Sequence, residues 1–99
     1  MHRRHHAVTL QQASEESPAL AKLAALARDS RDRLRAIESL IPAALRPAIQ
    51  PGPIDADNWC LLVRGNAAAA KMRQLLPALQ AHLRSRGWEV NAIRLKVQT

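Results

Sequence analysis

The sequence predicts a small α+β protein, a single domain in which helices cover one face of a small sheet. Three observations lead to this prediction. Ala and Leu supply 19 and 14 of the 99 residues, which favours helix. Two long stretches have apolar residues at helical spacing, and three short runs have the length and composition of strands. The predicted elements follow the order α, β, β, α, β. The sequence has no internal repeat, and its length suits one domain.

The first helix is predicted to begin at Ser17-Pro18, because Ser is a good N-cap and Pro fits the first helical position. Its charged stretch, residues 28–35, is interpreted as a solvated face, with Asp29 and Arg33 at a favourable i,i+4 spacing. Pro42 is expected to end or kink the helix, and Pro47 to end it again. The apolar stripe comprises Leu20, Leu23, Ala27, Leu34, Ile37, Ile41 and Leu45.

The first two strands are predicted on either side of a turn. Residues 59–63 are apolar throughout, and residues 47–54 are expected to pair with them as an edge strand interrupted by prolines. Cys60 is the single cysteine of the chain, so it has no internal disulfide partner. Its place in an apolar run predicts a buried and unreactive thiol.

The second helix is predicted from Asn66, as its N-cap, to Gly87, as its C′ residue. Pro77 lies within the helical pattern and predicts either a kink or two short helices that meet near Leu76-Pro77. The final strand follows, because Ile93, Leu95 and Val97 alternate with polar residues. The apolar stripe of the helix comprises Met72, Leu75, Leu76, Leu79 and Leu83.

The formal net charge of +7 is unevenly distributed. Residues 66–99 carry six basic residues and one acid, whereas residues 15–65 carry seven of each. A local excess of this kind is typical of a surface that faces a polyanion, although general solvation explains it as well. Residues 1–16 are interpreted as a flexible basic arm, and residues 17–99 as the domain. The predicted nucleic-acid-binding residues are Lys71, Arg73, Arg84, Arg86, Arg94 and Lys96, with Arg3 and Arg4 in the arm.

The sequence contains no pattern that indicates an enzyme. It has no paired carboxylates, no nucleophile with a partnered base and no phosphate-binding glycine loop. The cluster of His2, His5 and His6 lacks cysteine or carboxylate neighbours, so no metal and no cofactor are expected. No stretch is apolar enough to span a membrane, and the N-terminus is unlike a signal peptide. We therefore expect a cytoplasmic protein, associated with the nucleoid, with no membrane or small-molecule partner.

The succession of four segments resembles the bacterial DciA family, whose members load or operate the replicative helicase. The segments are "LRAIESLIPAALRP", the strand "NWCLLVRG", the helix "NAAAAKMRQLLPALQAHL" and the closing strand "VNAIRLKV". The resemblance covers about residues 20–97. It implies a fold similar to a type II K-homology domain, affinity for DNA, and the helicase DnaB as partner. The basic residues are expected to contact phosphate, so the predicted ligand is single-stranded or junction DNA bound independently of sequence. A K-homology domain grips nucleotides with a Gly-x-x-Gly loop, but the matching place, about residues 74–77, holds no glycine.

Two further predictions concern partners. Trp88, after Gly87, is a candidate contact residue, and Leu20, Leu23 and Leu26 form a candidate helix-in-groove contact. For the leucines, packing on the protein's own sheet is the favoured interpretation. An RNA-binding module of K-homology type, including a ribosome-associated one, is the alternative to the replication factor, and the missing glycine loop argues against it.

Overall fold

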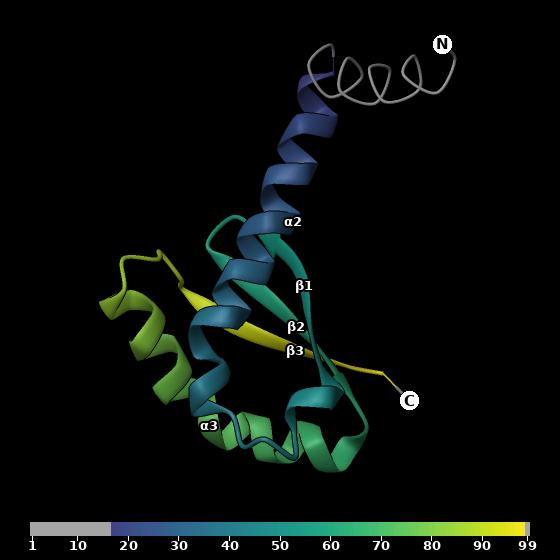
Figure 1. Ribbon diagram of the computed structural model, residues 1–99, viewed down its shortest axis with the longest axis vertical. Helices are drawn as coiled ribbons and strands as arrows, with labels where there is room; N and C mark the ends of the chain where they lie inside the picture. The colour runs from purple at the N-terminus through teal and green to yellow at the C-terminus, as the bar shows by residue number, and fades with distance from the viewer. Residues whose placement is uncertain (1–16, 99) are drawn as a thin grey trace, which may run out of the picture.

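The computed structural model describes residues 17–98 and confirms a small α+β domain. The order of elements is the predicted α, β, β, α, β, with two short 3-10 helices in the first connection (Figure 1). The elements are α2 (Pro18–Ile37), η1 (Glu38–Leu40), η2 (Arg46–Ala48), β1 (Ile49–Asp55), β2 (Asn58–Arg64), α3 (Asn66–Ser85) and β3 (Ala92–Gln98).

The sheet has three strands in the order β1-β2-β3. β1 and β2 form an antiparallel hairpin whose register shifts between Pro51 and Ile54, as expected for a proline-interrupted edge strand. β2 and β3 are parallel, and α3 makes the crossover between them. Among the described residues β3 pairs only with β2, so the sheet ends there in an open edge.

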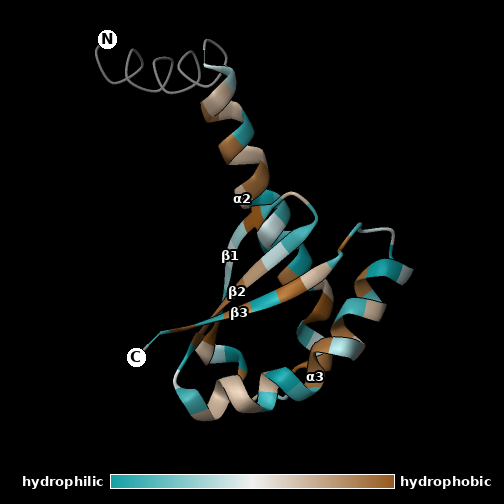
Figure 2. Ribbon diagram, turned by 180° about the vertical axis from the view of Figure 1, so that it is seen from behind, coloured by the Kyte–Doolittle hydropathy of each residue, from teal (hydrophilic) through white to brown (hydrophobic). Residues whose placement is uncertain are grey.

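Both helices contribute to a core on one face of this sheet. Trp59, Leu61 and Val63 of β2 are fully buried there, and Ile93 of β3 lies beside Trp59. α2 adds Ile37, whereas α3 adds four residues, Ala69, Met72, Leu79 and Leu83. No helix of the described residues covers the other face, which is turned toward the viewer in Figure 2. Figures 1 and 2 also show the N-terminal half of α2 projecting beyond the sheet.

The ends of α2 follow from local chemistry. The Ser17 hydroxyl accepts a hydrogen bond from the Leu20 amide at 3.4 Å, and Pro18 takes the first helical position, as predicted. The α-helix ends at Ile37, and a 3-10 turn follows. Ile41 has extended backbone angles, φ −95° and ψ 126°, because a residue before proline avoids the helical region. Ile41 and Leu45, which were predicted to continue the apolar stripe of the first helix, therefore lie beyond its end.

α3 is one helix, so the alternative of two short helices is wrong, and the bend near its middle in Figure 1 fits a kink at Pro77. Asn66 is the first helical residue and not the cap. The cap position belongs to Gly65, whose φ of +92° suits glycine. Gly87 has a φ of +96° at the other end, which confirms it as the C′ residue.

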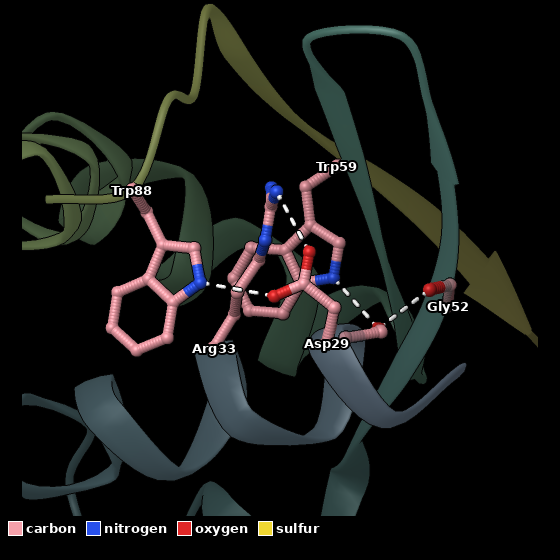
Figure 3. A network of polar contacts seen from close by, with 6 residues as sticks. Asp29, Arg33, Gly52, Trp59 and Trp88 are labelled. Atoms are coloured by element: carbon pink, nitrogen blue, oxygen red, sulfur yellow. Dashed lines mark hydrogen bonds and ion pairs between the residues drawn. The ribbon is translucent and has the colours of Figure 1, made fainter. Parts of the chain in front are cut away.

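The charged stretch of α2 is not simply a solvated face, because Ser30 and Arg33 are buried. The Ser30 hydroxyl donates a hydrogen bond to the Gly52 carbonyl at 2.6 Å. The same hydroxyl oxygen accepts one from Nε1 of Trp59 at 2.8 Å (Figure 3). The Ser30 side chain thus provides a hydrogen-bond partner for the buried Gly52 carbonyl on β1 and for the buried Trp59 N–H on β2.

Gly52 allows the hairpin to close beneath this contact. A Cβ at residue 52 would lie 2.7 Å from the backbone carbonyl oxygen of Cys60 on the facing strand. Backbone atoms cannot move aside as a flexible side chain can, so only glycine fits this position.

None of the helices described is long and apolar enough to cross a bilayer.

Replacing Ser30→Ala should lower the free energy of unfolding by about 1–3 kcal/mol, because the Trp59 indole N–H and the Gly52 carbonyl lose their partner in a buried site. Urea unfolding followed by tryptophan fluorescence measures this. Ser39→Ala is the matched control, since Ser39 is exposed, and it should change stability by less than about 0.5 kcal/mol. Equal effects of the two substitutions would contradict the bridging role.

Replacing Gly52→Ala should cost about 1–3 kcal/mol or more, because the added methyl group overlaps the Cys60 carbonyl and forces the strands apart. Gly87→Ala is an informative comparison, because it strains only the backbone at positive φ, with no atom within 4 Å of the new Cβ. If Gly52→Ala is tolerated without loss of stability in urea, the two strands are not held as closely as described.

Candidate nucleic-acid interface

The face of the sheet opposite the core carries a group of exposed cations. Arg94 and Lys96 of β3 are exposed, and they alternate with Ile93, Leu95 and Val97, which point toward the core, as predicted. The parallel register places Arg94 beside Cys60, Lys96 beside Leu62, and Gln98 beside Arg64. We call this surface, formed by Gln50, Cys60, Leu62, Arg64, Arg94, Lys96 and Gln98, the open face.

The cations of the open face are not neutralised by acids of the described chain. The ion pairs found within residues 17–98 are Asp29–Arg33 and Asp32–Arg35, both within α2. The acid nearest in register is Asp55, which pairs with Asn58 at the far end of β2 from Arg64. Arg64, Lys96 and Gln98 lie toward one end of this solvent-facing surface, whereas Arg94 lies nearer the end that holds Asn58. Cations and amides exposed on one face of a sheet suit phosphate oxygens.

The middle of the open face is apolar. Cys60 and Leu62 are half-buried, with backbone neighbours on both sides, and Leu62 also lines a groove that Leu23, Leu26 and Ala27 of α2 share. The prediction that Cys60 belongs to the buried core is wrong, because the alternation of β2 turns Trp59, Leu61 and Val63 inward and Cys60 outward. The open face has no aromatic side chain, so base stacking is not built into it.

The predicted basic residues of α3 lie elsewhere. Lys71 and Arg73 are exposed near the start of α3, which packs on the core side of the sheet. They are two residues apart and therefore point to different flanks of the helix. Arg84 is exposed, but its guanidinium donates to the Val90 and Asn91 carbonyls at 3.0 and 3.4 Å. Arg86 is exposed at the C-cap.

The structure therefore brings together only part of the predicted binding set. Arg94 and Lys96 share a face with Arg64, which was not among the residues predicted from the sequence. A signal for Arg64 was present, because it continues the alternation of Cys60 and Leu62 along the same strand. Arg3 and Arg4, the arm of residues 1–16 and its histidines lie outside the described residues.

The place that corresponds to a K-homology Gly-x-x-Gly loop is helical. Residues 74–77 lie inside α3, which runs without a break from Asn66 to Ser85. The chain consequently offers no loop there for gripping a nucleotide backbone, and the open face is left as the basic surface with the clearest phosphate-binding geometry.

Trp88 is hydrogen-bonded to α2 and half-buried, and its contact with a partner stays a prediction. Its indole nitrogen donates to Oδ1 of Asp29 at 3.0 Å, and Oδ2 of Asp29 accepts from Nη2 of Arg33 at 3.2 Å. Figure 3 shows this group beside the Ser30–Trp59 contact. Arg33 is 6% exposed, and its Nε and Nη1 have no hydrogen-bond partner among the described residues. Half-buried Trp88 thus fastens the segment after α3 to α2.

The three leucines proposed as a partner contact are in different environments. Leu20 and Leu23 are 51% and 62% exposed, whereas Leu26 is half-buried. The favoured interpretation, that they pack on the protein's own sheet, is wrong for Leu20 and Leu23, because each of them is more than half exposed.

Residues 17–98 contain no group of three or more His, Cys, Asp or Glu side chains that could hold a metal ion. No family model, curated protein or solved structure matches this chain.

Replacing Asp29→Ala should destabilise the domain by about 3 kcal/mol, because it leaves the buried Arg33 guanidinium without its acid. Arg33→Met should be far less harmful, since an apolar side chain of similar length removes the buried charge and its two unpartnered nitrogens. Urea unfolding of both variants measures the contrast. A larger loss in Arg33→Met than in Asp29→Ala would show that the guanidinium itself stabilises the fold.

Proposed function

We propose that this protein is a non-enzymatic nucleic-acid-binding domain that contacts the phosphate backbone through the open face. The observation that carries the proposal is the set of three cations, Arg64, Arg94 and Lys96, with no acid of the described residues paired to them. Cations held on a rigid sheet contact phosphate without reading base edges, so binding is independent of sequence and weakens as salt rises.

The apolar centre of the open face supports a single-stranded ligand. Cys60 and Leu62 lie between the cations and Gln50, where the sugar and base faces of an unpaired strand can rest. A duplex keeps its base faces stacked in its interior and offers only phosphates, sugars and the base edges of its grooves, so it cannot rest a base face on this centre. We therefore propose single-stranded DNA as the ligand. The three cations are few, so we expect modest affinity at physiological salt.

The resemblance to the DciA family adds a partner to this proposal. On that resemblance, the protein acts in DNA replication by binding the replicative helicase DnaB and assisting its loading onto single-stranded DNA. Pull-down of the helicase of the same organism, with and without single-stranded DNA, tests this. Retention of the helicase supports the loading function. Its absence, together with salt-sensitive DNA binding, would leave the nucleic-acid function and remove the partner.

The double substitution Arg94→Gln and Lys96→Gln should weaken binding of a labelled single-stranded oligonucleotide by about tenfold or more. The slope of log affinity against log salt should become shallower by about 1.4, or about 0.7 for each phosphate that is no longer neutralised. Fluorescence anisotropy across a salt series measures both. Lys71→Gln with Arg73→Gln is the matched control, since it removes the same charge from α3. If the control weakens binding equally, the open face is not the interface.

Cys60 provides an independent footprint of the open face, because it is the single thiol of the chain and lies beside Arg94. Bound single-stranded DNA should slow its alkylation several-fold, and the double variant should lose this protection. Mass spectrometry of the alkylated protein follows the reaction. Alkylation that proceeds at the same rate with saturating DNA would place the ligand elsewhere.

DNA and RNA of the same sequence should be compared in the same anisotropy assay. The open face presents amides at Gln50 and Gln98, but a contact to phosphate does not distinguish the two sugars. Equal or weaker binding of RNA supports the replication function. A clear preference for RNA would favour the alternative, an RNA-binding module, because recognition of the 2′-hydroxyl would then contribute to affinity.

A further inference from the structure

The two edges of the sheet are protected to different degrees. β1 carries Pro51 and Pro53, which have no amide hydrogen to donate, and its register shifts between Pro51 and Ile54. Prolines and irregular register hinder the pairing of an edge strand with another chain. β3, at the border of the sheet in Figures 1 and 2, has seven residues without proline or glycine and a regular register with β2. β3 is therefore the edge that can accept a further strand.

The backbone groups of β3 point alternately toward β2 and away from it. Gln98 turns its backbone toward β2, because its carbonyl accepts a hydrogen bond from the Gly65 amide at 2.9 Å. Every second residue of a strand faces the same neighbour. The amides and carbonyls of Ile93, Leu95 and Val97 therefore point outward, where none of the described strands lies. These groups are available to the backbone of a partner strand.

The apolar side of β3 is incompletely covered at this edge. Ile93 is buried, but Leu95 and Val97 are only half-buried, although both pack against the core. A strand added beside β3 would place its own apolar side chains next to these two, since opposed residues of neighbouring strands share a face. Removing the exposed parts of Leu95 and Val97 from water would favour the addition.

Charge determines which kind of strand fits this edge. Arg94 and Lys96 are exposed on the other face of β3, and no ion pair within residues 17–98 involves them. An acidic side chain directly opposite either cation would stabilise the pairing, whereas a basic one would destabilise it. Residues 66–99 carry six basic residues and one acid, Glu89, so the surroundings of β3 add to this preference. The sequence of the partner strand should therefore be acidic.

We infer that the edge of β3 binds an extended segment of a partner protein in which acidic and apolar residues alternate. Its backbone bonds to the outward amides and carbonyls of Ile93, Leu95 and Val97. Its apolar side chains cover Leu95 and Val97, and its carboxylates lie beside Arg94 and Lys96. Strand addition of this kind takes its affinity from backbone hydrogen bonds and its specificity from alternate side chains. The inference does not rest on nucleic-acid binding, and it is tested on the full chain without nucleic acid.

The probe is a labelled peptide of seven residues, the length of β3, in which valine and glutamate alternate. Fluorescence anisotropy should show saturable binding. The same peptide with lysine in place of glutamate should bind about tenfold or more weakly, because its cations oppose Arg94 and Lys96. The double variant Arg94→Glu and Lys96→Glu should prefer the lysine peptide. Both residues are exposed, so the variant should keep its helical circular dichroism.

Lys71→Glu with Arg73→Glu is the matched control, since it makes the same change of charge on α3. This control should still prefer the glutamate peptide. The inference would be overturned if the glutamate peptide failed to bind the unaltered chain. Reversal of the preference to the same extent in the control would also overturn it, because net charge and not the edge of β3 would then decide.

A second pair of peptides tests whether the backbone of β3 takes part. An extended peptide turns every second amide toward β3, so methylation of one alternate set of its amides should weaken binding by about tenfold or more. Methylation of the other set should leave binding unchanged. Bound peptide should also slow hydrogen exchange at the outward amides of Leu95 and Val97, measured by NMR. Equal effects of the two methylated sets, or no protection of these amides, would exclude strand addition at this edge.

Discussion

The buried N–H of Trp59 requires an acceptor, and the way this requirement is met determines how α2 is attached to the sheet. The indole of Trp59 is the largest fully buried side chain, but it also brings into the core a polar group that water cannot reach. Ser30 accepts this N–H and donates its own proton to the Gly52 carbonyl. A single hydroxyl therefore fixes the helix against two strands, and Gly52 permits the strands to lie close enough for this contact.

The attachment of α2 through Ser30 gives the two faces of the sheet different roles. Because α2 and α3 both contribute to the core on one side, the other side of the sheet has no apolar layer to hide and can carry charge. The basic residues that alternate along β3, joined by Arg64, occupy that side. Fixing α2 at Ser30 and Arg33, in its second half, also leaves its first half beyond the sheet, with leucines that its own core does not use.

Periodicity, capping preferences and the positions of the prolines predicted the order of elements, the cap at Ser17, the interrupted edge strand and the two faces of β3, because each depends on neighbours close in sequence. It did not predict that Ser30 and Arg33 are buried, since their burial depends on Trp59, Gly52 and Trp88, which are distant in the chain. Cys60 was misplaced for a different reason. Residues 59–63 are all apolar, so the pattern does not reveal which residues turn inward. Of the candidate site, Arg94 and Lys96 could be predicted, whereas their neighbour Arg64 required the strand register.

The cations of β3 also affect whether the open edge of this strand can pair with a strand of another molecule. In the parallel pairing with β2, the backbone of Gln98 faces β2, since its carbonyl accepts from the Gly65 amide. The amides and carbonyls of Ile93, Leu95 and Val97 therefore point outward, where another strand could add. If two β3 strands met antiparallel about Leu95, Arg94 of one would face Lys96 of the other, and like charges directly opposed destabilise such a pair. Arg94 and Lys96 thus disfavour this edge-to-edge pairing of two β3 strands.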